Sequence, residues 1–327
     1  MKTKIKIYFS DFWPGFDCRN NVFFKILSDK YSVVLDECSP DFLFCSCFGN
    51  SFLRYNCVKI YYTGENITPD FNLFDYSIGF DYILCGDRYL RFPIYRLYQQ
   101  LDDGYTTEGI FENKANFRKR KFCNFLYSNE LCANRFRLDL LDSIEKYKHV
   151  ECGGKIRNNI GGRVRDKNSW LKDFKFTIAC ENSSKIGYVT EKIFEALRAN
   201  TIPIYWGDPQ IDKEFNPRRF INCHNYKNLD AVVAEIRRID DDFEEYLRML
   251  KEPWFVGDVP PLPENDIKLR EFLYNIIDQG PVASRRTIQD GFTRGYWRKQ
   301  KWLSIVEPGF KIYSKLRSLW ETEKQKI

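Results

Sequence analysis

The stretch that decides the fold is residues 174–209, FKFTIACENSSKIGYVTEKIFEALRANTIPIYWGDP. A hydroxyl side chain is a preferred helix N-cap, and Thr190 stands directly before a helical pattern. A short helix between two strands implies that the strands are parallel, which is typical of an α/β fold. The predicted order is strand, loop, helix and strand, at Phe174–Cys180, Glu181–Val189, Glu191–Ala199 and Thr201–Trp206.

Polar side chains gather around the start of this predicted helix, namely Asn182, Tyr188, Glu191 and Lys192. The free N–H groups of a helix amino terminus attract anions. The lysine can neutralise a diphosphate, and the glutamate can accept hydrogen bonds from sugar hydroxyls. The pattern indicates an anion site, and the alternative is a surface ion pair in the first helical turn.

The residues before this stretch show the same alternation of strands and helices. The segment Val58–Tyr62 is a predicted buried strand that ends in the turn-rich sequence TGEN at 63–66. Ligands collect at the carboxyl ends of strands in open parallel sheets, so Glu65 is a second candidate carboxylate. Earlier strands are predicted at Lys4–Ser10, Tyr31–Asp36 and Asp41–Cys47, and a helix at Val22–Leu27.

The periodicity fails over Asp102–Arg120, where we place a domain boundary. A strand at Phe122–Tyr127 and a helix at about Ala133–Tyr147 then begin a second α/β unit. Arg135 falls in the first turn of that helix, where a cation is unfavourable unless an anion is present. It is therefore a candidate phosphate ligand, and the alternative is an exposed arginine. The predicted domains are residues 1–116 and 117–300, followed by a basic amphipathic tail at 301–327.

Composition limits the class of protein. The 327 residues are 43% hydrophobic and 29% charged, which excludes a disordered, collagen-like or coiled-coil chain. A net charge of +6 is too mild to imply a nucleic-acid partner. With 11 cysteines in no C-x-x-C pair and 2 histidines, neither a zinc site nor a Ser-His-Asp triad is expected. The chemistry therefore rests on carboxylates, amines and guanidiniums, and no metal site is expected at Asp240–Asp242, which we interpret as helix surface.

Three stretches resemble one known family. The sequence ACENSSKIGYVTEKIFEALRANTIPIYWGDP at 179–209 is similar to the donor-binding motif of the family 10 α1,3/4-fucosyltransferases. The stretches YYTGENITPDFNLFDYSIGFD at 61–81 and DRYLRFP at 87–93 resemble the bacterial members that act on lipopolysaccharide. The resemblance implies a GT-B architecture, in which two Rossmann-like domains face a cleft. It also implies inverting transfer of L-fucose from GDP-fucose to the 3- or 4-hydroxyl of GlcNAc or Glc in a lactosamine-type glycan or O-antigen.

The same resemblance implies roles for single residues. Glu65 would be the general base, and Lys192 and Arg135 would stabilise the leaving diphosphate. Arg137 competes with Arg135 for that role, because the alignment around SNELCANRFR slides by one or two positions. Glu191 would hold donor hydroxyls or stabilise the developing oxocarbenium ion. Asn182 and Tyr188 would position the phosphates and the fucose.

The resemblance implies no required cofactor, with a divalent metal at most stimulatory. No carboxyl-terminal heptad repeat is visible, but the amphipathic segment Phe310–Glu323 is similar to the tails of those relatives. It is predicted to pack on the protein or to lie on a membrane surface. No secretion signal or run of roughly 18 apolar residues is visible, so the expected location is the cytoplasm or the inner face of the cytoplasmic membrane. The alternatives are another nucleotide-sugar transferase and a non-catalytic glycan-binding module.

Overall fold

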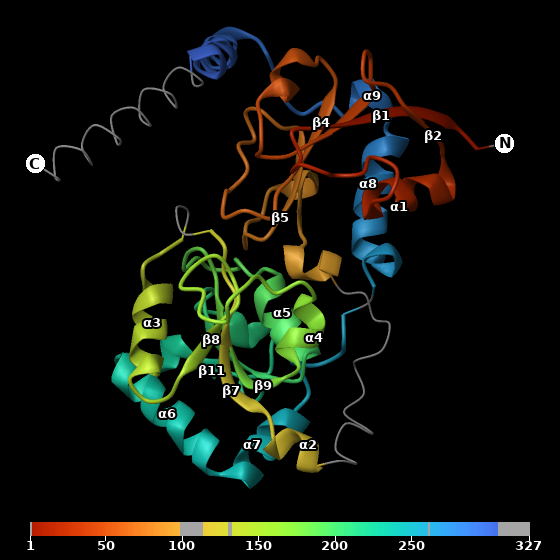
Figure 1. The fold of residues 1–327 in the computed structure, drawn as a ribbon. Helices are drawn as coiled ribbons and strands as arrows, with labels where there is room; N and C mark the ends of the chain where they lie inside the picture. Colours follow the sequence, from red (N-terminus) through yellow and green to blue (C-terminus); the bar gives the residue numbers. More distant parts are fainter. Residues whose placement is uncertain (1, 99–113, 130–132, 261, 307–327) are drawn as a thin grey trace, which may run out of the picture. The chain divides into compact units, whose positions relative to one another are not determined.

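The computed structural model describes residues 2–98, 114–129, 133–260 and 262–306. Their contacts divide the chain into two compact units, both visible in Figure 1. The first unit consists of the residues up to Gly79, Leu84–Leu90 and the residues from Ile267 onward. The second unit consists of Phe80–Ile83 and Arg91–Asp266.

The first unit contains a sheet in the strand order β2-β1-β3-β4-β5-β6. The first five of these strands pair in parallel. Helix α1 connects β1 to β2, as the alternating pattern predicted. The bounds are β1 Lys4–Ser10, α1 Val22–Lys30, β2 Ser32–Leu35, β3 Phe42–Cys45, β4 Val58–Tyr62, β5 Tyr76–Gly79 and β6 Tyr89–Arg91.

The C-terminal helices return to the first unit. Helix α8 (Ile267–Asp278) lies beside α1, where the Tyr274 hydroxyl donates a hydrogen bond of 3.1 Å to the Ile26 carbonyl (Figure 1). Helix α9 (Gly280–Ala283) and a helix over residues 291–306 follow. On the latter helix, the buried Trp297 donates from Nε1 to the Asn72 carbonyl at 3.1 Å. The residues from Ile267 to residue 300 therefore belong to the first unit, whereas we predicted them in the second domain, 117–300. The sequence could not show this, because an apolar helix face does not specify which sheet it covers.

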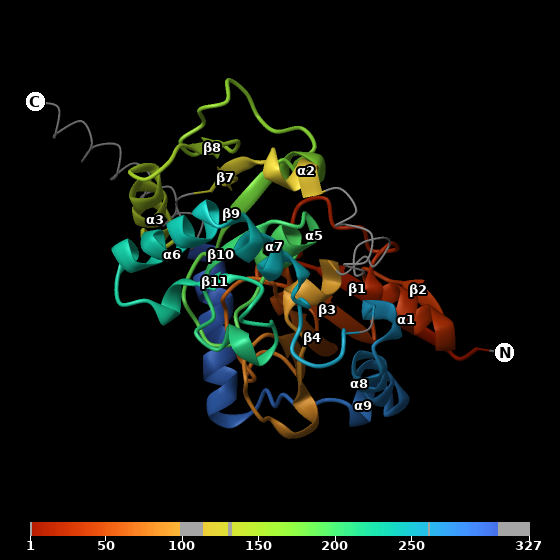
Figure 2. The same ribbon diagram turned by 90° about the horizontal axis from the view of Figure 1, so that it is seen from below.

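The second unit contains a parallel sheet in the order β11-β10-β9-β7-β8 (Figure 2). This is the strand order of a doubly wound sheet. Successive strands are added on one side of β7 as far as β8 and then on its other side from β9 onward, so the switch point lies between β7 and β9. Ligands bind at this switch point, outside the carboxyl ends of the strands. The bounds are β7 Lys121–Phe125, β8 Val150–Cys152, β9 Phe174–Cys180, β10 Ile202–Trp206 and β11 Ile221–Asn222.

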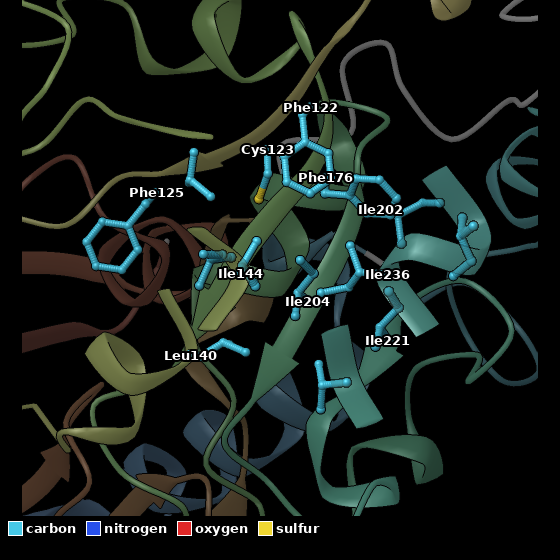
Figure 3. Packing of buried hydrophobic residues seen from close by; sticks show 14 of the residues in the cluster. Phe122, Cys123, Phe125, Leu140, Ile144, Phe176, Ile202, Ile204, Ile221 and Ile236 are labelled. Atoms are coloured by element: carbon cyan, nitrogen blue, oxygen red, sulfur yellow. The ribbon is translucent and has the colours of Figure 1, made fainter. Parts of the chain in front are cut away.

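Both faces of this sheet are covered by helices. Phe176 and Ile178 of β9 belong to the cluster on one face, which also includes Leu140 of α3 and Ile236 of α6 (Figure 3). Ala179 belongs to the cluster on the other face with residues of α5. This alternation is the period of two expected for a strand. The helices are α2 Lys114–Arg118, α3 Phe136–Glu145, α4 Lys167–Leu171, α5 Glu191–Arg198, α6 Leu229–Asp241 and α7 Phe243–Lys251.

The tail prediction is only partly covered by the described residues. Residues 301–306 continue the helix that starts at residue 291, whereas the predicted amphipathic segment 310–323 lies outside the described residues. Within the described ranges, no helix combines the length and apolar character that a bilayer span requires.

Candidate active site

A cavity of about 450 Å³ opens at the carboxyl ends of β7, β8 and β9, at the switch point of the second sheet. We call it the switch-point pocket. Its cationic and acidic side chains are contributed by helices α3, α4 and α5 and by the loop before α4. The lining residues are Leu126, Tyr127, Ser128, Asn129, Arg137, Gly153, Gly154, Arg163, Val164, Lys167, Leu171, Thr177, Ile178, Asn182, Glu191, Lys192 and Glu195. Three predicted site residues, Asn182, Glu191 and Lys192, are therefore brought together here.

The first turn of α5 carries a lysine among three oxygen acceptors. Nζ of Lys192 lies 3.0 Å from Oε2 of Glu181, 2.7 Å from Oγ1 of Thr190 and 3.5 Å from Oε1 of Glu191. Burial alone would lower the pKa of Lys192, but the two carboxylates outweigh it and raise the pKa. Burial would likewise raise the pKa of Glu191, but the lysine and local hydrogen bonds lower it. Both side chains therefore stay charged at neutral pH.

Glu181 is a residue that the sequence interpretation missed. It directly follows β9, and its side chain is fully buried. It accepts hydrogen bonds of 2.7 Å from both the backbone N–H and the hydroxyl of Thr190. Thr190 is the N-cap residue, as predicted, but its side chain binds Glu181 instead of capping the helix. The available signal was the one that singled out Glu65, a glutamate at the carboxyl end of a buried strand.

The two candidate arginines lie in different environments. Arg137 is buried, donates from Nη2 to Oδ1 of Asn182 at 2.8 Å, and lines the pocket. The Arg135 side chain is 88% exposed and pairs with Asp139. Arg135 is not among the residues that line the switch-point pocket, and it lines a second cavity of about 290 Å³ to which Arg137 also contributes. Helix α3 starts at Phe136, so Arg137 lies on the helix face that packs on the sheet and Arg135 precedes the helix.

Tyr188 does not line the switch-point pocket in the described part of the chain. It is buried, and its ring contacts that of Phe80 edge-on with centroids 5.1 Å apart. Gly187 has a φ of +82°, and a Cβ there would lie 2.4 Å from the Phe80 carbonyl oxygen. Arg91, from the DRYLRFP stretch, donates to the Phe80 carbonyl at 2.9 Å and pairs with Glu214. Tyr188 thus anchors the loop after β9 to the segment around Phe80.

A second acid–base pair lines the pocket. Lys167 pairs with Glu195, which lies one turn after Glu191 on α5. Burial raises the pKa of Glu195, and Lys167 opposes this effect. The sequence interpretation missed both residues, although the i,i+4 spacing of Glu191 and Glu195 places them on one helix face.

Glu65 belongs to the first unit, in the loop after β4. Its backbone N–H donates to Oγ1 of Thr63 at 3.0 Å, and Thr63 Oγ1 lies 3.2 Å from Cys47 Sγ. Cys47 follows β3, so both residues lie at the carboxyl edge of the first sheet. Glu65 is partly exposed at that edge.

Among the described residues, no group of three histidine, cysteine or acidic side chains is arranged to hold a metal ion. We expected the acidic run at 240–242 to be helix surface, and this expectation is wrong for Asp240. The Asp240 side chain is 2% exposed and pairs with Lys148 and Lys175, each at 2.7 Å. These pairs join α6 to β9 and to the segment between α3 and β8.

Two α/β units with parallel sheets, one of which holds a cation-lined pocket at its switch point, are features of the GT-B class of nucleotide-sugar transferases. Family comparisons agree with this class. Residues 7–98 match the alpha-(1,3)-fucosyltransferase FucT N-terminal domain, and residues 116–254 match the C-terminal part of glycosyltransferase family 10 (fucosyltransferase). The chain belongs to glycosyltransferase family 10.

Solved structures support the same assignment. A crystal structure of an alpha1,3-fucosyltransferase with GDP is 31% identical, with a TM-score of 0.70 over 84% of this chain and 90% of that one. Another, with GDP-fucose, is 30% identical, with a TM-score of 0.71 over 88% and 93% of the two chains. The predicted GT-B fold is thereby confirmed.

Curated relatives agree in sequence. The alpha-(1,3)-fucosyltransferase FucT of Helicobacter pylori is 36% identical over 289 residues, which cover 76% of this chain and 60% of that protein. A putative fucosyltransferase of Acanthamoeba polyphaga mimivirus is 31% identical over 52% of this chain and 29% of its own length. The chain therefore spans three fifths or less of these two relatives.

Proposed function

We propose that this protein transfers L-fucose from GDP-fucose to a hydroxyl of a glycan acceptor. The observation that carries the proposal is the convergence of Arg137 and Lys192 with Asn182 and Glu191 in one pocket at the sheet switch point. Two cations in a partly buried site suit a diphosphate, and two solved family members contain GDP or GDP-fucose.

The donor roles follow from the pocket geometry. Lys192 and Arg137 contact the diphosphate and stabilise the charge that grows on it as the bond to fucose breaks. Glu191 accepts hydrogen bonds from donor hydroxyls, and Asn182 orients the Arg137 guanidinium. We assign the diphosphate contact to Arg137 instead of Arg135, because the latter is exposed and paired with Asp139. Tyr188 acts indirectly, by fixing the loop.

Glu65 is our candidate general base. Its carboxylate takes the proton of the acceptor hydroxyl while that oxygen attacks C1 of fucose. The C1–oxygen bond to GDP breaks with the electron pair leaving on the diphosphate, so one displacement inverts the configuration at C1. The acceptor is the 3- or 4-hydroxyl of GlcNAc or Glc in a lactosamine-type glycan, including an O-antigen.

The first test is GDP release from GDP-fucose, with and without N-acetyllactosamine, in the presence of EDTA. Acceptor-dependent release is expected, because the proposed chemistry requires no metal ion. Glu65→Gln is expected to abolish turnover but to leave GDP affinity unchanged, since Glu65 does not line the switch-point pocket. Full turnover by this variant would overturn the base assignment. If the parent protein neither releases GDP nor binds GDP-fucose, a glycan-binding module would be favoured.

The proposed location is the cytoplasm, with peripheral attachment to the inner face of the cytoplasmic membrane. Phe292, Trp302 and Ile305, on the helix over residues 291–306, are 102%, 60% and 76% exposed among basic side chains. Exposed apolar and basic residues on one helix suit an anionic membrane surface. The test is liposome flotation of the full chain and of a chain that ends at Pro308. Equal binding would remove the residues after Pro308 from the proposal and leave the helix over residues 291–306 as the candidate contact.

A further inference from the structure

The ammonium of Lys192 has three N–H donors and three oxygen acceptors around it. Two acceptors, Oε2 of Glu181 and Oγ1 of Thr190, belong to buried residues that do not line the switch-point pocket. The third, Oε1 of Glu191, lies on the pocket wall and is the most distant, at 3.5 Å. The two buried acceptors therefore bind the ammonium on the side away from the pocket. The remaining N–H of Lys192, which is nearest to Glu191, faces the switch-point pocket.

Glu181 is itself held on several sides. Its backbone N–H donates to the Trp206 carbonyl of β10 at 2.7 Å, which continues the pairing of β9 and β10. Its carboxylate accepts from the backbone and the hydroxyl of Thr190. Gly207 lies so close that a Cβ there would stand 2.4 Å from Cγ of Glu181. Because these contacts fix the Glu181 carboxylate, they also fix the position of the Lys192 ammonium that it binds.

We propose that Glu181 is a positioning residue, which fixes the charged Lys192 side chain so that its free donor points into the switch-point pocket. The inference rests on the proposed function, in which Lys192 contacts the donor diphosphate. In the complex, a diphosphate oxygen accepts the hydrogen bond from the Lys192 N–H that faces Glu191. Glu191 is then free to accept a hydrogen bond from a hydroxyl of GDP-fucose. Glu181 and Thr190 keep their bonds to the lysine throughout.

The charges around Lys192 support this role. The facing groups are the carboxylates of Glu181 and Glu191 and the guanidinium of Arg137. Without Glu181, the lysine would face Arg137 and a single carboxylate, and burial would lower its pKa. Weaker donor binding at high pH would follow, because a neutral amine attracts a diphosphate less than an ammonium does.

The test compares Glu181→Gln with Asp240→Asn. Both changes replace a buried carboxylate that binds lysine by the amide of the same shape, but Asp240 binds Lys175 at the opposite end of β9. We expect kcat/KM for GDP-fucose to fall roughly 10- to 100-fold in Glu181→Gln, because small misplacements of a binding group have effects of this size. The loss of GDP affinity should begin at lower pH than in the parent. Asp240→Asn should lose thermal stability but keep kcat/KM within about twofold.

A second pair of variants avoids the loss of a buried charge. Thr190→Val removes the hydroxyl that joins Glu181 to Lys192, and no side-chain cap is lost with it. Thr190→Ser keeps the hydroxyl. We expect Thr190→Val to lower kcat/KM and Thr190→Ser to restore it. If Glu181→Gln does not fold, this pair carries the test.

A readout without nucleotide separates the two proposals. Acetic anhydride labelling of Lys192, followed by mass spectrometry across pH, reports the protonation of its amine. Labelling in Glu181→Gln should begin at lower pH than in the parent, with Lys167 in the same pocket as internal control. Unchanged labelling together with unchanged kcat/KM would overturn the positioning role. If the parent binds no GDP but Glu181→Gln still shifts the labelling of Lys192 to lower pH, the assignment of GDP-fucose as the sugar donor would be overturned. The positioning role of Glu181 would then remain supported.

Discussion

The Nη2 atom of Arg137 donates a hydrogen bond of 2.8 Å to Oδ1 of Asn182, which joins helix α3 to the loop after β9. The Asn134 N–H donates to the backbone carbonyl of Asn182 at 2.8 Å, so the amide residue is tied to the start of α3 twice. These bonds fix the guanidinium near the carboxyl ends of the neighbouring strands β7 and β9. The donor site therefore depends on the contact between α3 and this loop.

The first prediction separates the two arginines. Arg137→Ala is expected to lower GDP affinity by about 100-fold or more, because a charge-assisted contact in a partly buried site is lost. Arg135→Ala should change it less than about twofold, since its side chain is exposed and paired with Asp139. Isothermal titration of GDP into the parent and the two variants measures both effects. The reverse order would return the diphosphate role to Arg135.

The second prediction concerns Lys192 in turnover. Lys192→Ala is expected to lower kcat by roughly 100- to 1,000-fold, because the lysine stabilises charge that develops on the leaving diphosphate. Single-turnover kinetics at saturating GDP-fucose isolate this step from donor binding. An effect confined to KM would show that the lysine binds the donor without stabilising the transition state.

The third prediction is a flat pH profile for donor binding. Lys192 has a raised pKa and loses its proton only above its ordinary value of 10.5, whereas Glu191 has a lowered pKa and gains one only below 4.5. Burial raises the pKa of Glu181, and Lys192 and the two hydrogen bonds from Thr190 oppose this shift. GDP-fucose affinity should therefore be constant from about pH 7 to 9. A steep change in that range would show that a different group controls binding.

The fourth prediction tests the close approach at Gly207. A Cβ there would meet Cγ of Glu181 at 2.4 Å and the Tyr205 hydroxyl at 2.6 Å. Gly207→Ala should cost about 1–3 kcal/mol in unfolding free energy, because overpacking a rigid site forces atoms apart. Gly162→Ala is the matched control, with no atom within 4 Å, and should stay within about 0.5 kcal/mol. Urea denaturation measures both, and equal stabilities would contradict the packing argument.

Local patterns predicted much of the second unit. Strand β9 has the predicted bounds, and helix α5 starts at the predicted Glu191, because apolar periodicity and a capping residue are local signals. The grouping of Asn182, Glu191 and Lys192 followed from the same unit, since a strand end and the next helix start lie at one edge of a parallel sheet.

Other features depend on contacts that periodicity does not encode. A shift in the start of α3 by a few residues decides whether Arg135 or Arg137 faces the sheet, and helix boundaries are the least certain part of a sequence prediction. The burial of Glu181 could not be predicted without knowing that the side chains of Thr190 and Lys192 both bind its carboxylate. The return of α8 to α1 spans most of the chain, and no local pattern identifies such a partner.

The most direct test of the account is the structure of the product formed from N-acetyllactosamine and GDP-fucose. We expect mass spectrometry to show the addition of a single fucose. NMR should show an α-linked fucoside on the GlcNAc 3- or 4-hydroxyl, in agreement with inversion at C1. GDP-mannose and UDP-galactose should give no product under the same conditions. A β-linked fucoside would contradict the single displacement, and transfer from a different nucleotide sugar alone would contradict the proposed donor.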